Sequence, residues 1–174
     1  MFYLATPRVS NPPDLVPIGP YYTMKAEADN PEGPWHKTSS FTPFDPTPET
    51  GANAGPGPVL RQGGEYWMFF TGLGLARAQN LDGPWKVDLS VRLPQEGCEN
   101  ASLYFEPTNN TWFLFTNHIG AGYTDAIWVY WTKDITCWNP EHKALVLDGA
   151  TCSWSKTIIG LPSVIRVGNR LAML

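Results

Sequence analysis

"AEADNPEGPWHK" at residues 26–37 recurs fifty residues later as "ARAQNLDGPWKV" at residues 76–87. The two stretches align without a gap and share two alanines, an asparagine, an acidic position and the triplet Gly-Pro-Trp. These flanking matches favour a true repeat over a three-letter coincidence. A looser third copy, "YWTKDITCWNP", occupies residues 130–140 and places Trp138 53 residues after Trp85. A period of about 40–50 residues with several strands in each unit indicates a β-propeller.

Short apolar runs, rich in aromatic and β-branched residues, surround the repeats. Such runs predict strands, and they lie at residues 66–71, 111–116, 126–132 and 162–167. The 16 glycines and 17 prolines are scattered along the chain, so no window accommodates a long helix. The sequence therefore predicts an all-β protein.

Each repeat follows one order of elements: an inner strand, a turn, an aromatic or apolar second strand, a third strand, and a turn that ends in tryptophan. The expected inner strands lie at residues 59–61, 102–105 and 163–167, and the second strands at 66–71, 112–116 and 170–174. We expect the tryptophans to fill the wedge between neighbouring sheets. This role is structural and does not involve stacking on a sugar.

The repeats divide the chain into approximate units at residues 1–50, 51–95, 96–150 and 151–174. The first unit begins on a second strand at residues 2–6, and the last unit ends on one. A propeller needs about four or more blades to close. We therefore expect an incomplete fragment of about three blades, truncated at both ends and completed by a longer protein or by other chains.

The composition narrows the class of protein further. A chain of 174 residues can form one domain with a sizeable core. The net charge is −4 with no basic run, which argues against a nucleic acid partner. The apolar runs are shorter than the roughly 18 residues of a membrane helix, so we expect no membrane partner.

Three cysteines, Cys98, Cys137 and Cys152, show no CxxC spacing, which argues against a structural zinc site. The chain can hold one bridge between Cys137 and Cys152 or three free thiols, and we favour the free thiols. Nucleotide-binding and serine-hydrolase motifs are missing from the sequence, so a cofactor-dependent oxidoreductase and a serine hydrolase have no support.

The inner strands of a propeller line its central channel. Residues just before an inner strand share a rim with the loop that joins the second and third strands. Of the three stretches that lead into inner strands, only "EGCENASL" at residues 96–103 supplies acids, Glu96 and Glu99. We expect Glu99 to point into the channel, where apolar surroundings raise a carboxyl pKa and allow general acid catalysis. The alternative is a solvated loop acid, which is our expectation for Glu96.

The loop "NHIGAGYTD" at residues 117–125 belongs to the same rim. Its polar side chains can hydrogen-bond sugar hydroxyls, and so can the side-chain amide of Asn100, next to Glu99. The candidate substrate-binding residues are Asn100, Asn117, His118, Tyr123 and Asp125. For two of them a role other than sugar binding remains open. His118 can be ordinary polar surface, and Asp125 can cap a turn.

These features resemble the five-bladed β-propeller glycoside hydrolases, most closely families 43 and 117 and more distantly family 32. The likeness covers most of residues 55–174. It rests on the Gly-Pro-Trp turn after an A-x-A strand and on "ENASLYFEPTNNTWFLFTNH" at residues 99–118. The resemblance implies that Glu99 is the general acid. In family 43 two Asp residues stand on the first two inner strands; here the first such strand would lie before residue 1, and the second, at 55–59, has no Asp.

The resemblance implies hydrolysis of glycosidic bonds in a plant or algal poly- or oligosaccharide by carboxylate acid/base catalysis. The expected partner is the carbohydrate substrate. No cofactor is expected; a structural calcium ion is compatible with such folds, but no ligand cluster indicates one. The sequence leaves the compartment open, although the resembled family implies a secreted or periplasmic protein. The alternatives are a glycan-binding propeller without catalysis, which the missing Asp favours, and an interaction scaffold.

Overall fold

The computed structural model describes residues 1–6, 8, 20–39, 41, 55–70, 74–91, 98–118, 126–155 and 159–174. The described residues form strands and one short 3-10 turn, η1 (Gly149–Thr151). The strands are β1 (Phe2–Ala5), β2 (Tyr22–Glu27), β3 (His36–Lys37), β4 (Pro56–Gln62), β5 (Glu65–Phe70), β6 (Gly74–Ala78), β7 (Lys86–Val87), β8 (Cys98–Glu106), β9 (Thr111–His118), β10 (Ala126–Thr132), β11 (Lys143–Asp148), β12 (Val164–Val167) and β13 (Arg170–Met173).

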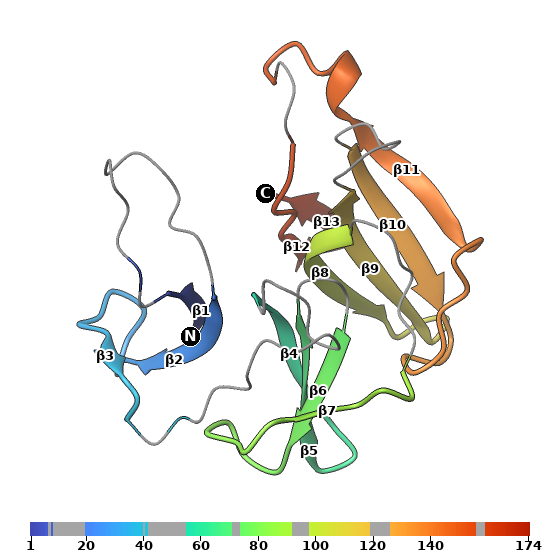
Figure 1. Cartoon of the computed structure of the whole chain (residues 1–174). Helices are drawn as coiled ribbons and strands as arrows, with labels where there is room; N and C mark the ends of the chain where they lie inside the picture. Colours follow the sequence, from blue (N-terminus) through green and yellow to red (C-terminus); the bar gives the residue numbers. More distant parts are fainter. Residues whose placement is uncertain are drawn as a thin grey trace. The chain divides into compact units, whose positions relative to one another are not determined.

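Contacts divide the chain into two compact units, Met1–Leu89 and Ser90–Leu174. The first unit holds a three-stranded sheet, β1-β2-β3, and a four-stranded sheet, β4-β5-β6-β7 (Figure 1). In both sheets each strand pairs antiparallel with the next one along the chain. The predicted strand at 66–71 is β5, and the inner strand expected at 59–61 is the longer β4.

The two Gly-Pro-Trp repeats form the same turn, which links β2 to β3 and β6 to β7. In each, the asparagine side chain accepts a hydrogen bond from the amide two residues on, 3.1 Å from Glu32 N and 3.1 Å from Asp82 N. The glycine that follows has φ near +88°, a backbone region that glycine enters without steric cost. Both Gly-Pro peptide bonds are cis. The sequence repeat is therefore a structural repeat.

In the third copy an aspartate, Asp134, takes the place of the asparagine and forms a similar turn. Asp134 Oδ1 accepts a hydrogen bond from Thr136 N at 2.9 Å, and Asp134 O accepts one from Cys137 N at 2.9 Å. The tryptophan that follows is buried, as it is in the second copy: Trp138 and Trp85 are each 6% exposed. The indole of Trp138 donates to Ile135 O at 2.8 Å.

Trp85 joins the two sheets of the first unit. Its ring meets Phe2 of β1 edge-to-face, with ring centroids 5.9 Å apart, and it belongs to a core cluster with Phe41, Met68 and Phe70. This confirms the expected role between sheets. Trp35 differs, because it is 43% exposed. No residue in the described part of the first unit covers Trp35 as Phe2 covers Trp85.

The second unit holds a four-stranded sheet, in the order β11-β10-β9-β8, and the hairpin β12-β13 (Figure 1). The predicted runs at 111–116 and 126–132 are β9 and β10, and the run at 162–167 contains β12. β8 forms one edge of the larger sheet and contacts β12, where Val164 N donates to Ser102 Oγ at 3.0 Å. The next hairpin therefore packs beside the edge strand that carries Glu99.

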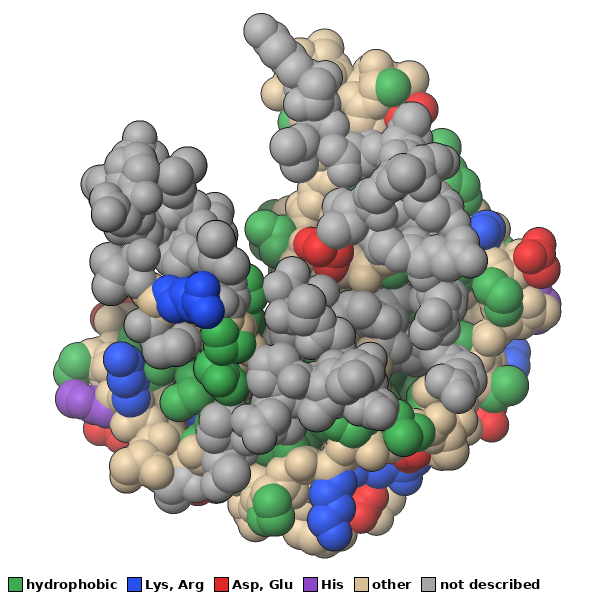
Figure 2. Space-filling view, viewed as in Figure 1, with side chains coloured by type: hydrophobic (Ala, Val, Ile, Leu, Met, Phe, Trp, Pro, Cys, Tyr) green, Lys and Arg blue, Asp and Glu red, His purple; other side chains and the backbone are tan. Residues whose placement is uncertain are grey.

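The described surface is mixed in charge. On the face drawn in Figure 2, lysine and arginine side chains are interspersed with acidic ones. Within the described ranges, no helix has the length and apolar character needed to span a membrane. All three cysteines are free thiols, as the sequence analysis favoured, and Cys98 is the buried one.

Candidate active site

A β-bulge shapes the first residues of β8. Glu99 pairs with Asn117 of β9 and Ser102 pairs with Phe115, so β8 carries one extra residue between these two pairs. Asn100, inside the bulge, has φ +56°, a left-handed conformation that asparagine tolerates better than most residues. Bulges at the edges of sheets re-aim side chains and are common beside active sites.

The bulge places Glu99 within β8, one residue after its start at Cys98. We had expected the inner strand to begin at residue 102, with Glu99 in front of it, and this boundary was wrong. The strand is longer because Thr116 Oγ1 donates to Glu99 O at 2.7 Å and keeps the bulged backbone attached to β9. The side chain of Glu99 is half-buried. Its carboxylate Oε2 accepts a hydrogen bond from Asn100 Nδ2 at 3.2 Å.

Asn117 lies behind this pair. Asn100 Nδ2 also donates to Asn117 Oδ1 at 3.0 Å. Asn117 is only 3% exposed. A methyl group added at Gly160 would lie 3.3 Å from Asn117 Oδ1, so the Gly160 backbone packs closely on this amide. The three residues form a chain of contacts from the protein interior to the carboxyl group of Glu99.

The structure thus brings together three of the predicted site residues, Glu99, Asn100 and Asn117. The backbone of His118 pairs with Cys98 and with Ala126, but its side chain lies outside the described part of the chain. The predicted positions Glu96, Tyr123 and Asp125 are also outside the described residues. A role for His118, Tyr123 or Asp125 in sugar binding stays a prediction, as does the solvated position expected for Glu96.

The opposite end of β8 carries a second carboxyl group that the sequence analysis did not single out. Glu106 accepts hydrogen bonds from the Thr108 hydroxyl at 2.7 Å, the Thr108 amide at 3.1 Å and the Tyr104 hydroxyl at 2.8 Å. Arg166 of β12 lies 3.8 Å away. These hydrogen bonds, those from Thr108 first, lower the pKa of Glu106 from 4.5 to about 2. Glu106 is therefore ionised at neutral pH and unsuited to donate a proton. The Glu-x-Thr spacing was the signal in the sequence.

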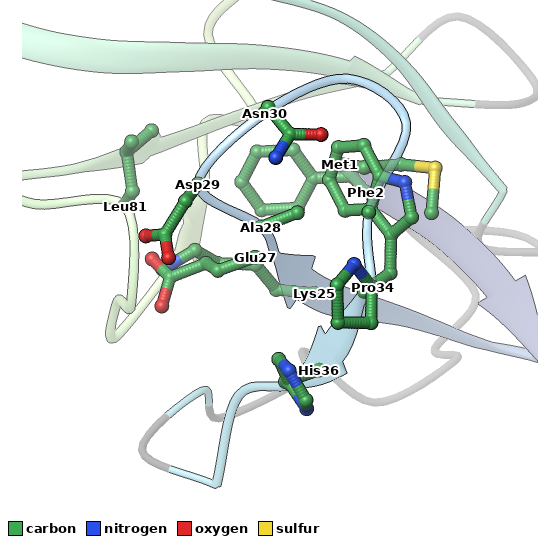
Figure 3. A pocket seen from close by; sticks show the side chains of 12 residues that line it. Met1, Phe2, Lys25, Glu27, Ala28, Asp29, Asn30, Pro34, His36 and Leu81 are labelled. Carbon is green, nitrogen blue, oxygen red and sulfur yellow. The ribbon is translucent and has the colours of Figure 1, made fainter.

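The first unit contains a pocket of about 700 Å³ at the β2–β3 turn, lined by Phe2, Lys25, Glu27, Asp29, Trp35 and His36 among others (Figure 3). Lys25 is 5% exposed and pairs with Glu27 at 2.6 Å and with Asp82 of the second repeat. Burial by itself lowers the pKa of Lys25, but hydrogen bonds and charge from Asp82 and Glu27 outweigh it and raise the pKa above 10.5.

This charge cluster ties two repeats together, because Lys25 belongs to β2 and Asp82 to the turn after β6. We did not expect this cluster from the sequence. The available signal was a difference between the aligned copies, since Glu27 stands where the second copy has Arg77. Among the residues that the structure describes, no three His, Cys, Asp or Glu side chains gather as metal ligands do.

Comparisons with known proteins bear on the fold. No family model matches the sequence, and no curated protein matches it. Among solved structures, the chain is similar to an endo-1,4-β-xylanase from Bacteroides thetaiotaomicron, with a TM-score of 0.58, 16% identity, and coverage of 88% of this chain and 58% of the xylanase. It is also similar to a mutant α-L-arabinanase from Cellvibrio cellulosa, with a TM-score of 0.55, 16% identity, and coverage of 87% and 57%.

The chain thus spans less than two thirds of the length of either enzyme. At 16% identity the likeness establishes the fold alone. The antiparallel sheets and this likeness together confirm an all-β protein with the propeller architecture of the glycoside hydrolases that its sequence resembles.

Proposed function

We propose that this protein takes part in the hydrolysis of glycosidic bonds in a poly- or oligosaccharide, with Glu99 as the general acid. The observation that carries the proposal is the half-buried carboxyl group of Glu99 at the bulged start of an edge strand, held by Asn100. The fold supports it, since both similar structures are of enzymes that are named for the polysaccharides xylan and arabinan.

In the proposed reaction, Glu99 protonates the glycosidic oxygen as the bond to the anomeric carbon breaks, and the leaving sugar departs as an alcohol. In the same step a second carboxylate either activates a water molecule or attacks the anomeric carbon. After such an attack, water deprotonated by Glu99 hydrolyses the glycosyl-enzyme and releases the sugar. The separation of the second carboxylate from Glu99 decides the outcome: about 6.5–9.5 Å implies inversion and about 5–5.5 Å implies retention. The residues that lead into β4 carry no carboxyl group, so the second carboxylate belongs elsewhere.

The proposed substrates are pentose polysaccharides, because the two similar structures are a xylanase and an arabinanase. Xylan, arabinan and the aryl glycosides of xylose and arabinose form the first test panel. The rim residues His118 and Asp125 remain proposed sugar ligands. Asn117, which is only 3% exposed, instead supports the side chain of Asn100.

Leaving-group dependence tests the role of Glu99. A general acid matters most when the leaving group is a poor one, since a dinitrophenolate departs without protonation. Glu99→Gln should therefore lose about 10²–10⁴-fold in kcat/KM on oligosaccharides, while activity on dinitrophenyl glycosides falls far less. Glu96→Gln is the matched control and should behave as the wild type. An equal loss on both substrate types in Glu99→Gln, or no loss on either, contradicts the proposal.

A second candidate is a propeller that binds glycans without cleaving them. The observation that favours it is the start of β4, where Gly55, Pro56 and Gly57 stand in place of an acid. Calorimetry that detects binding of xylo- or arabino-oligosaccharides, combined with chromatography that detects no product after prolonged incubation, would support this candidate.

A further inference from the structure

We infer that Asn100 is a positioning residue, which holds the carboxyl group of Glu99 in one orientation and determines which of its oxygens carries the transferable proton. The consequence for turnover rests on the proposed function. The orientation itself does not, because it follows from the contacts in the bulge.

The backbone at Asn100 aims the amide at its neighbour. With φ at +56°, the chain turns out of the regular strand path immediately after Glu99. The Thr116 hydroxyl fixes the Glu99 carbonyl at 2.7 Å, so the turn cannot relax by moving Glu99 away from β9. Consecutive side chains of a regular strand point to opposite faces, whereas the bulge brings the Glu99 and Asn100 side chains within 3.2 Å.

The amide nitrogen of Asn100 has two hydrogens, and each has an acceptor. One donates to Glu99 Oε2 at 3.2 Å and the other to Asn117 Oδ1 at 3.0 Å. An ionised carboxylate only accepts hydrogen bonds, which fixes the nitrogen of the amide on the side of Glu99. With both donors used inside the protein, this nitrogen is committed to holding Glu99.

Asn117 anchors the arrangement. It is 3% exposed and lies between Asn100 and the Gly160 backbone, where even a methyl group on Gly160 would come within 3.3 Å. An amide that is packed in this way has little freedom to rotate, so it keeps the Asn100 side chain in place. The chain of contacts from Gly160 through Asn117 and Asn100 therefore ends on Glu99 Oε2.

This geometry selects an oxygen. Oε2 already accepts a hydrogen bond from an N–H group, and a hydroxyl oxygen is a weaker acceptor than a carbonyl oxygen, so a proton on Oε2 would weaken that bond. When Glu99 is protonated, the proton therefore resides on Oε1, the oxygen that Asn100 leaves unbonded. During glycosidic cleavage this proton would pass from Oε1 to the leaving oxygen, and the resulting carboxylate would keep its hydrogen bond from Asn100.

Two substitutions separate the amide from the backbone. Asn100→Gly removes the donor and suits the left-handed conformation at least as well, and Asn100→Asp keeps the side-chain shape but turns an acceptor oxygen toward Glu99. The matched control is Asn110→Gly, because Asn110 also has a left-handed backbone, with φ +52°, in the turn between β8 and β9. The control reports the effect of the same exchange away from Glu99.

The first readout needs no turnover. Three-bond scalar couplings across χ1 of Glu99, measured by NMR on the full chain, should match a single rotamer in the wild type and in Asn110→Gly. In Asn100→Gly they should move to rotamer-averaged values. Unchanged couplings in Asn100→Gly overturn the inference, whatever the protein does to sugars.

The second readout is the split between kcat and KM on oligosaccharides. Asn100→Gly should lower kcat about tenfold, which corresponds to about 1.4 kcal/mol, and leave KM unchanged. Asn100→Asp should lower kcat further, because its carboxylate repels that of Glu99. A rise in KM with kcat unchanged would make Asn100 a sugar ligand and overturn the inference. If instead the couplings change as expected but Glu99→Gln hydrolyses as the wild type does, the positioning role stands and the proposed function fails.

Discussion

The contrast between two equivalent tryptophans gives a test of how the repeats pack. Trp85 and Trp35 occupy the same place in the repeated turn, but Trp85 is 6% exposed and Trp35 is 43% exposed. Trp85 packs edge-to-face on Phe2 and donates its indole N–H to Leu81 O at 3.3 Å. Replacing each tryptophan with alanine therefore removes very different amounts of buried contact from the same unit.

A buried tryptophan replaced by alanine costs about 3–5 kcal/mol, through lost burial and the cavity left behind. For Trp85→Ala we expect about 4 kcal/mol, because the site is enclosed by rings of two sheets. For Trp35→Ala we expect about 1–2 kcal/mol, since the ring is already partly in water and no enclosed cavity forms. With a urea m-value of about 2 kcal/mol/M, the midpoint should fall by roughly 2 M for Trp85→Ala and by less than about 1 M for Trp35→Ala.

The assay is urea unfolding followed by far-ultraviolet circular dichroism, which does not depend on the fluorescence of the removed indole. Phe2→Leu serves as a companion variant, because it removes the edge-to-face contact and leaves Trp85 in place; it should lower the midpoint by less than Trp85→Ala does. Equal losses of stability in Trp35→Ala and Trp85→Ala would mean that the packing of Phe2 on Trp85 adds no stability, contrary to this expectation.

Three further perturbations follow from the polar contacts. Hydrogen bonds from Thr108 hold the pKa of Glu106 at about 2 rather than 4.5. They therefore add stability that is complete above pH 4.5 and is lost as the pH falls toward 2. Urea midpoints of Glu106→Gln should change less over this pH range than those of the wild type. The pKa of Lys25 is raised above 10.5, so its ion pairs stabilise the fold below pH 10.5 and are lost as the pH rises through the folded-state pKa. The Lys25→Met protein should be less stable than the wild type at neutral pH. Its urea midpoint should also fall less steeply than that of the wild type above pH 10.5. Gly160→Ala should displace the Asn117 amide and cost about 1 kcal/mol, seen as a lower thermal midpoint, whereas Gly168→Ala, which meets no neighbour, should lose stability only through its backbone at φ +61°.

Local chemistry explains what the sequence could predict. The repeated turn needs an asparagine side chain that bonds its own backbone and a glycine with positive φ, and both requirements lie within four residues, 30–33. The strands β5, β9 and β10 were likewise predicted, because each is a continuous apolar and aromatic run bounded by turn residues. The order of elements within a repeat placed Glu99 at the entry to an inner strand, although it did not predict that Glu99 lies on the strand itself.

Contacts between distant residues explain what the sequence could not predict. The bulge that extends β8 to Cys98 depends on pairing with β9 and on the hydroxyl of Thr116, 17 residues from Glu99. The ion pair of Lys25 with Asp82 joins residues 57 positions apart, and Lys25 also pairs with Glu27 on its own strand. The exposure of Trp35 also depends on which sheet covers it, whereas both copies share the asparagine and the Gly-Pro-Trp triplet of the turn.

A crystal structure of the Glu99→Gln protein with a xylo- or arabino-oligosaccharide that it cannot cleave gives the sharpest test of the role proposed for Glu99. If Glu99 is the general acid, the side-chain amide of residue 99 should lie within about 2.6–3.2 Å of a glycosidic oxygen, while Asn100 still contacts the other polar side-chain atom of that residue. A sugar bound only at the β2–β3 turn of the first unit, or bound to β8 with residue 99 beyond hydrogen-bonding reach of every glycosidic oxygen, would contradict that role.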